Sequence, residues 1–148
     1  MAVLATTVAV VAGVAGAGTV AAKQRVKIQV TYGSAFTLTP LSTGAIKVDR
    51  GSASFCCWGR RFIVRDGQAI EIDNPQMTLT GKYGTIVAQN INNYVDLPDG
   101  WAVFTGTWKV VRATGSYKGL AGGGRLAGVA LANGATKAQF EGILAPKQ

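Results

Sequence analysis

Apolar and polar residues alternate along much of the chain, most cleanly between Lys23 and Tyr32. Every second residue from Val26 to Tyr32 is apolar, whereas the residues between them are polar. A period of two places the two sets on opposite faces of a β-strand. No strands alternate with long helical periods, so the pattern favours an all-β protein over a parallel α/β sheet. The further expected strands cover residues 36–41, 45–48, 52–58, 60–65, 68–73, 77–80, 84–94, 101–112, 126–132 and 135–144.

Turn signals between these stretches predict how the strands are connected. Asp66-Gly67 and Asn133-Gly134 are two-residue hairpin signals, and residues 97–100 predict a further turn. Short turns of this kind join about eight strands into a meander, which exposes two edges unless it closes on itself. The sequence therefore predicts an antiparallel up-and-down β-barrel of about eight strands, with a β-sandwich as the alternative. A barrel of that size is filled by side chains or holds one small ligand.

The stretch from Gly106 to Gly124 organises the rest of the chain. It opens as a strand that carries Trp108 and Val110 on one face. Thr114-Gly115 breaks the strand, because glycine admits the positive φ of a tight bend. We expect a compact turn in which Tyr117 and Leu120 plug one end of the core. Glycines 122–124 then begin a new strand in close contact with its neighbours.

The same residues carry a family resemblance. They fit the pattern Gly-Thr-Trp-x-Val-x-x-x-Thr-Gly-x-Tyr-x-Gly-Leu-x-Gly-Gly-Gly. This pattern resembles a region of small secreted bacterial proteins that are similar to the allene oxide cyclase barrel family and, more distantly, to dirigent proteins. The resemblance implies a barrel over roughly residues 23–144, and a dimer or trimer as in the relatives. It assigns no site residue, because it covers the glycine-rich turn and not the cyclases' cavity.

The chain is predicted to be one exported domain. Residues 1–22 contain no charge and are mostly Ala, Val, Gly and Thr, and small residues precede Lys23. This composition predicts a secretory signal peptide, with a single barrel domain over residues 23–148. No Lys or Arg precedes the apolar run, which suggests a start codon upstream of Met1. The alternative is an uncleaved membrane anchor, because about 20 apolar residues span a bilayer.

The net charge of +8, from 15 basic and 7 acidic residues, lies wholly after Ala22. It favours solubility and affinity for an anionic cell envelope. Nucleic acid is not an expected partner, because the basic residues are scattered singly apart from Arg60-Arg61, and because export leads away from it.

The residue inventory excludes several kinds of chemistry. The chain has no histidine, which removes Ser-His-Asp and Cys-His catalysis and histidine-based metal sites. Glycines 122–124 lack the Lys-Ser/Thr partner of a phosphate-binding loop. Cys56 and Cys57 cannot complete a zinc site alone, so no metal or cofactor is expected. We expect one buried thiol and one on the opposite face, and the alternatives are a vicinal disulfide, which would be a redox pair, or a link between two chains.

Few residues remain as candidates for a site. Glu71 and Glu141 lie in mid-strand, where we expect solvated side chains paired with Lys or Arg across strands. The competing hypothesis is that an inward Glu71 or Glu141 acts with Asn90 to orient a small ligand. The tryptophans are expected to pack in the core rather than to line a cavity; they are Trp58, Trp101 and Trp108.

The favoured function is that of a secreted, non-enzymatic barrel that binds a small apolar ligand or an envelope component. The resemblance implies an alternative, a cyclase or isomerase that steers ring closure of a lipid-derived substrate. Such steering holds a reactive species in one conformation and needs few acid or base residues. A second alternative is a structural or interaction protein whose barrel is packed with side chains.

Overall fold

The computed structural model describes residues 22–147, and the expected leader therefore lies outside the described residues except for Ala22. The described chain forms ten strands and two short 3-10 turns. The strands are β1 (Gln24–Thr31), β2 (Ala35–Pro40), β3 (Asp49–Cys56), β4 (Arg60–Arg65), β5 (Gln68–Asp73), β6 (Gln76–Gly81), β7 (Gly84–Asp96), β8 (Ala102–Ala113), β9 (Leu120–Ala130) and β10 (Thr136–Pro146). The 3-10 turns are η1 (Pro98–Gly100) and η2 (Gly115–Tyr117).

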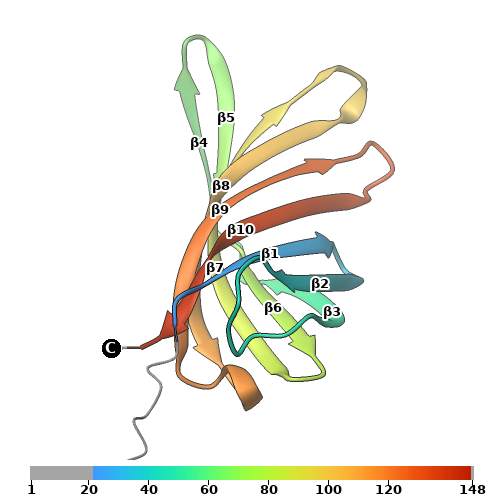
Figure 1. Ribbon diagram of the computed structural model, residues 1–148. Helices are drawn as coiled ribbons and strands as arrows, with labels where there is room; N and C mark the ends of the chain where they lie inside the picture. The colour runs from blue at the N-terminus through green and yellow to red at the C-terminus, as the bar shows by residue number, and fades with distance from the viewer. Residues whose placement is uncertain (1–21, 148) are drawn as a thin grey trace, which may run out of the picture.

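Eight of these strands close into an antiparallel β-barrel in the order β1-β2-β3-β6-β7-β8-β9-β10, and β10 pairs with β1 (Figure 1). The predicted fold class, an all-β up-and-down barrel, is confirmed. Successive connections alternate between the two ends of such a barrel. One end, here called the mouth, has the connections after β1, β3, β7 and β9. The other, called the closed end, has residues 41–48, 82–83 and 114–119.

Strands β4 and β5 form a hairpin inserted between β3 and β6, and this hairpin projects beyond the barrel at the mouth (Figure 1). Besides its hairpin partner β4, β5 pairs with the mouth end of β7, where Asp73 lies opposite Asn92. The expected turn is confirmed, since Asp66 and Gly67 both adopt positive φ. The hairpin therefore extends the inner face of β7 past the barrel.

One expected strand is wrong, because residues 45–48 lie in a loop. The side chain of Gln24, rather than a neighbouring strand, engages the backbone of Ile46. Its Nε2 donates to the Ile46 carbonyl at 3.0 Å, and its Oε1 accepts from the Ile46 N–H at 2.9 Å. A buried glutamine thus pins this loop across the closed end.

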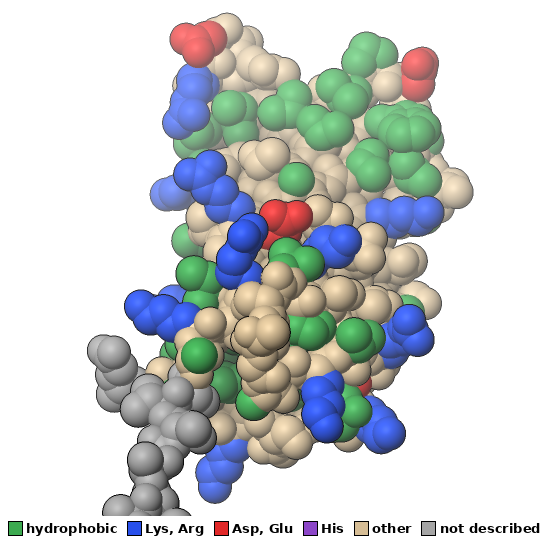
Figure 2. Space-filling view, in the orientation of Figure 1, with side chains coloured by type: hydrophobic (Ala, Val, Ile, Leu, Met, Phe, Trp, Pro, Cys, Tyr) green, Lys and Arg blue, Asp and Glu red, His purple; other side chains and the backbone are tan. Residues whose placement is uncertain are grey.

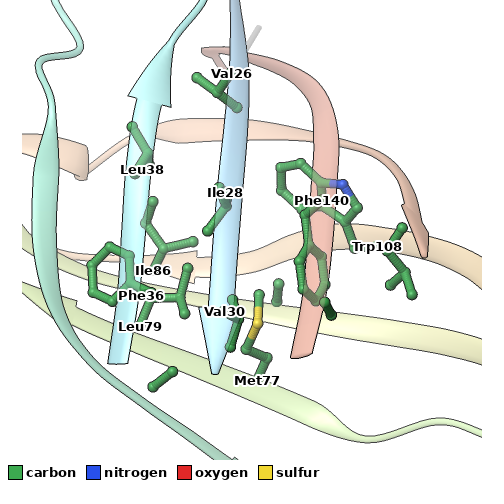
Figure 3. Close-up of a cluster of buried hydrophobic side chains, with 14 of the residues drawn as sticks. Val26, Ile28, Val30, Phe36, Leu38, Met77, Leu79, Ile86, Trp108 and Phe140 are labelled. Carbon is green, nitrogen blue, oxygen red and sulfur yellow. The ribbon is translucent and has the colours of Figure 1, made fainter. Parts of the chain in front are cut away.

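Apolar side chains fill the barrel interior, and part of this core is drawn in Figure 3. Trp108 is the largest of them, and it lies opposite Gly124, which in turn lies opposite Gly142. Neither glycine has a side chain, so none competes with the indole for space over these two strands. The indole packs edge-on against the Phe140 ring, with ring centroids 6.3 Å apart. A Cβ on Gly124 would collide with the carbonyl of Glu141. These glycines therefore let β9 and β10 approach each other closely beneath the indole.

Tyr117 plugs the closed end, as the sequence predicts. Its ring is buried, and its hydroxyl donates to Oδ2 of Asp49 at 2.7 Å. The N–H groups of Lys82 and Arg50 donate to Oδ1 of the same carboxylate at 2.9 and 2.8 Å. Burial opposes the charge of Asp49, but these donors hold its pKa below the usual range. The carboxylate ties three connections of the closed end together.

Candidate functional site

Polar side chains gather inside the barrel at the mouth. Asn90, Asn92 and Tyr94 alternate along β7 and point inward, because side chains two residues apart share a face. Asp73 of β5 lies opposite Asn92, and Tyr32 follows β1. Both asparagines are fully buried, and Asp73 is nearly so. These five residues are called the mouth chamber.

Aromatic rings close the mouth chamber toward solvent. Tyr32 stacks on Phe55 with ring centroids 3.8 Å apart, and Tyr94 stacks on Phe104 at 4.6 Å. The pair Tyr94–Phe104 lies one step nearer to the mouth than Asn92 does. These four rings, called the aromatic layer, separate the asparagine side chains from water.

Most polar atoms of the mouth chamber lack a partner. Within residues 22–147, no well-aligned hydrogen bond reaches Oη of Tyr32, Oδ1 of Asp73 or either amide atom of Asn90 and Asn92. Asn92 nevertheless lies close to Asp73 and Tyr94, and the Tyr32 hydroxyl lies close to that of Tyr94. Each such group costs about 1–3 kcal/mol, and buried polar groups in native proteins are normally satisfied. Asp49, by contrast, is surrounded by donors at the other end of the same barrel. The polar groups of the mouth chamber are therefore less completely hydrogen-bonded than Asp49 is.

The electrostatics of the mouth chamber favour uncharged groups. Burial raises the pKa of Asp73 to about 6, and nearby Glu71 raises it further, while Asn92 and Arg60 oppose the shift. Burial also raises the pKa of Tyr94 to about 12 and that of Tyr32 above its usual range. Asp73 can therefore gain or lose a proton near neutrality, beside two phenols that stay protonated.

The projecting hairpin extends this site with apolar surface. Phe62 lies opposite Glu71, and Glu71 lies opposite Tyr94, so these side chains share the inner face. Phe62 is 67% exposed, and Val64, two residues along, is 77% exposed. Apolar side chains gather at this end of the molecule (Figure 2). Arg60 and Glu71 form an ion pair with Nε and Oε1 2.6 Å apart, between this surface and the mouth chamber.

The structure separates the residues singled out from the sequence. Asn90 lies in the mouth chamber, and Glu71 lies at its edge, paired with Arg60. Glu141 is exposed on the outer wall, where Oε1 accepts a hydrogen bond from the Gln139 side chain at 2.7 Å. Asn90 and Glu71 therefore lie on the inner face of the sheet, whereas Glu141 lies on its outer face.

Sequence reasoning missed Asp73, Asn92 and both tyrosines of the mouth chamber. The signal was present in part, because Asn90, Asn92 and Tyr94 keep the two-residue period of a strand. Asp73 gave no such signal, since its place opposite Asn92 depends on how the hairpin pairs with β7.

Cys56 and Cys57 form a vicinal disulfide, and both are exposed. The expectation of one buried thiol with its neighbour on the opposite face is wrong. β3 ends at Cys56, and Cys57 adopts a φ of 63°, so the two side chains no longer alternate as they would in a strand. The pair lies at the mouth, just before the projecting hairpin.

Two of the three tryptophans also differ from expectation. Trp108 is buried at 2% exposure, whereas Trp58 is 55% and Trp101 45% exposed. Both exposed rings lie in connections at the mouth, where no core is available to cover them.

The pKa of Asp73 leads to a testable stability change. Because burial raises this pKa from 3.8 to about 6, the ionised carboxylate destabilises the fold above pH 6, and the penalty fades as the pH falls toward 3.8. Asp73→Asn is therefore expected to raise the free energy of unfolding at pH 8 by on the order of 2 kcal/mol. The gain should vanish near pH 4, as measured by urea unfolding across the pH range. Asp96→Asn, an exposed control, should show no gain, and a pH-independent effect of Asp73→Asn would contradict the assignment.

Within residues 22–147, no three cysteine or acidic side chains come together to hold a metal ion. That part of the chain also has no helix with the length and apolar character needed to cross a membrane.

Comparison with protein-family models, with curated proteins and with solved structures finds no match to the chain. The barrel is shown by the structure itself, and the resemblance to the allene oxide cyclase family stays a prediction.

Proposed function

We propose that the chain is an exported binding protein that receives a small, mainly apolar molecule in the mouth of its barrel. The observation that carries this proposal is the set of unpartnered polar atoms beneath the aromatic layer. Ligand sites combine apolar walls with a few convergent polar groups, and barrel mouths are common places for them. The ligand supplies the hydrogen bonds that the mouth chamber lacks.

The chemistry of the mouth chamber limits the ligand. Each asparagine amide offers two donor hydrogens and an acceptor oxygen, so a hydroxyl or a carbonyl group can satisfy either residue. Burial disfavours a charged group at this depth. The ligand is therefore an apolar molecule with one or two neutral polar groups. The exposed side chains of Phe62 and Val64 on the hairpin offer apolar surface for its body.

Export is part of the same proposal. The uncharged run over residues 1–22 fits a signal peptide, and an exposed disulfide fits an oxidising compartment. The mature protein is expected to begin at Lys23, which the mass of the protein purified from its own host measures. Retention of residues 1–22 would indicate a membrane anchor instead.

Replacing both asparagines with leucine separates ligand binding from folding. Asn90→Leu with Asn92→Leu removes unsatisfied polar atoms at similar volume, so we expect the free energy of unfolding to rise by about 1–3 kcal/mol. The same change removes the groups that orient a ligand. Native mass spectrometry of the unmodified protein should show an additional mass that is lost on denaturation, and the double variant should lack it.

The control is the same substitution on the outer face of the same strand. Asn93→Leu should keep the additional mass, because Asn93 is exposed and points away from the mouth chamber. If the protein has no bound molecule and does not bind the neutral dye N-phenyl-1-naphthylamine, that result would favour the alternative function, a structural or interaction protein whose barrel is packed with side chains. If the double variant loses stability, the asparagines have partners in solution and the proposal fails.

A second candidate function rests on Asp73. A carboxyl group with a pKa of about 6 beside two buried phenols can transfer protons near neutrality. This arrangement suits an isomerase or cyclase that steers ring closure of a lipid-derived epoxide. Formation of a single enantiomer from an unsaturated fatty-acid epoxide in the presence of the protein would establish that activity, and a racemic product would exclude it.

A further inference from the structure

A hollow lies at the closed end of the barrel, away from the mouth chamber. It encloses about 350 Å³, which is within the range of small-molecule sites. Three connections and the end of β10 surround it. Its apolar lining consists of Ala45, Ile46, Tyr83, Tyr117, Leu120 and Pro146. It is called the closed-end pocket.

The floor of this pocket is held in place by the Asp49 network. Tyr117 donates its hydroxyl to Asp49, and the N–H of Tyr83 donates to the same carboxylate at 3.3 Å. Because Asp49 is buried and its oxygens are occupied by these donors, it offers the pocket no free acceptor, although its negative charge remains beneath the floor. The floor therefore presents preformed aromatic surface.

The rim of the closed-end pocket is basic. Lys47 and Lys118 belong to its lining, and Lys82 places Nζ 5.6 Å from the centre of the Tyr83 ring. Lys147 lies beside them, since its N–H donates to the carbonyl of Gly119 at 2.7 Å. Within residues 22–147 the single ion pair is Arg60–Glu71 at the mouth, so none of these lysines is in an ion pair.

Charge is divided between the two ends of the barrel. The connections at the closed end, residues 41–48, 82–83 and 114–119, contain no acidic residue, and the one carboxylate at this end is the buried, hydrogen-bonded Asp49. Five of the seven carboxylates lie instead at or beside the mouth; they are Asp66, Glu71, Asp73, Asp96 and Asp99. Figure 2 shows acidic side chains at the two upper tips of the face it presents and mainly basic ones below. This division makes the closed end the attractive end for an anion.

We propose that the closed-end pocket binds a small anionic amphiphile. Its apolar body lies against Ile46, Tyr83 and Leu120, and its carboxylate or phosphate group lies between Lys47 and Lys118. A neutral apolar molecule would make no ionic contact with the lysines, and a simple anion would make no contact with the apolar floor. Only a ligand with both an anionic group and an apolar body contacts both parts of the pocket. The proposal is independent of the mouth chamber, because no residue is shared between the two sites.

Decanoate and decanol test the proposal as a matched pair, since they differ in charge and not in chain length. Decanoate should shift the backbone NMR signals of residues 46, 83, 118 and 120, and decanol should bind at least about tenfold more weakly. Lys47→Gln with Lys118→Gln should weaken decanoate binding about tenfold and leave decanol unchanged. Lys109→Gln, on the outer wall, serves as the matched control and should bind like the unmodified protein.

Vesicles distinguish the two sources of such a group. If signals at the closed end change only with phosphatidylglycerol vesicles, and not with phosphatidylcholine vesicles or decanoate, the anion is a lipid headgroup at a membrane surface. If decanoate alone suffices, the ligand is a soluble amphiphile. Equal binding of decanoate and decanol, shifts confined to other parts of the barrel, or binding unaffected by the lysine variant would overturn the proposal. The double variant Asn90→Leu with Asn92→Leu should still show the decanoate-induced shifts at the closed end. The proposal for the mouth chamber and the proposal for the closed-end pocket can therefore be disproved independently.

Discussion

Asp49→Ala is expected to lower the free energy of unfolding by about 3–5 kcal/mol. The substitution removes one buried carboxylate that accepts hydrogen bonds from the N–H groups of Arg50, Lys82 and Tyr83 and from the hydroxyl of Tyr117. A hydrogen bond to a charged group contributes about 1.5–3 kcal/mol, and donors left buried without a partner add their own cost. Urea unfolding followed by tryptophan fluorescence measures the change.

The matched comparison is Tyr117→Phe, which removes one of these bonds and keeps the carboxylate. It should cost about 1–3 kcal/mol, clearly less than Asp49→Ala. Because its donors lower the pKa of Asp49 below 3.8, the carboxylate stabilises the fold above that pH. The stabilisation is lost as the pH falls through the folded-state pKa. The difference between the unmodified protein and Asp49→Ala should therefore shrink below pH 4, and a constant difference would contradict this account.

The barrel was predictable from the sequence because two independent constraints agree. The two-residue period places Val26, Ile28 and Val30 on one face, and a meander of such strands must hide its edges. The turn after Ala113 was predictable for a local reason, since Thr114-Gly115 breaks the strand and Tyr117 is the apolar residue that follows. Local chemistry and closure together therefore determine the fold.

The candidate sites were less predictable, because they depend on pairing between distant segments. Asp73 is followed by Asn74-Pro75, and nothing local shows that its partner is Asn92. Asp49 resembles an ordinary turn residue before Arg50-Gly51, yet Tyr117, 68 positions away, makes it part of the core. Alternation gives two faces to every strand, and only closure decides which face is inside.

The vicinal disulfide shows the same limit at shorter range. A strand places adjacent side chains on opposite faces, so Cys56 and Cys57 are expected to point apart. The left-handed backbone at Cys57 ends the strand two residues earlier than the pattern predicts. The pairing of the two thiols therefore depends on a single backbone angle that the composition of the segment does not show.

Trp108→Ala is expected to lower the free energy of unfolding by about 3–5 kcal/mol, because it opens a cavity at the centre of the barrel. The indole is 2% exposed, packs against Phe140, and donates Nε1–H to the carbonyl of Glu141 at 3.3 Å. Neighbouring strands cannot collapse into the space, since the carbonyl of Glu141 already lies against Gly124. Trp101→Ala is the matched control and should cost less than about 1 kcal/mol, because that ring is 45% exposed. Urea unfolding followed by circular dichroism compares the two variants without relying on the fluorescence that they alter. Equal losses of stability would mean that Trp108 is not packed as described. The barrel interior would then rearrange to fill the space that the indole leaves.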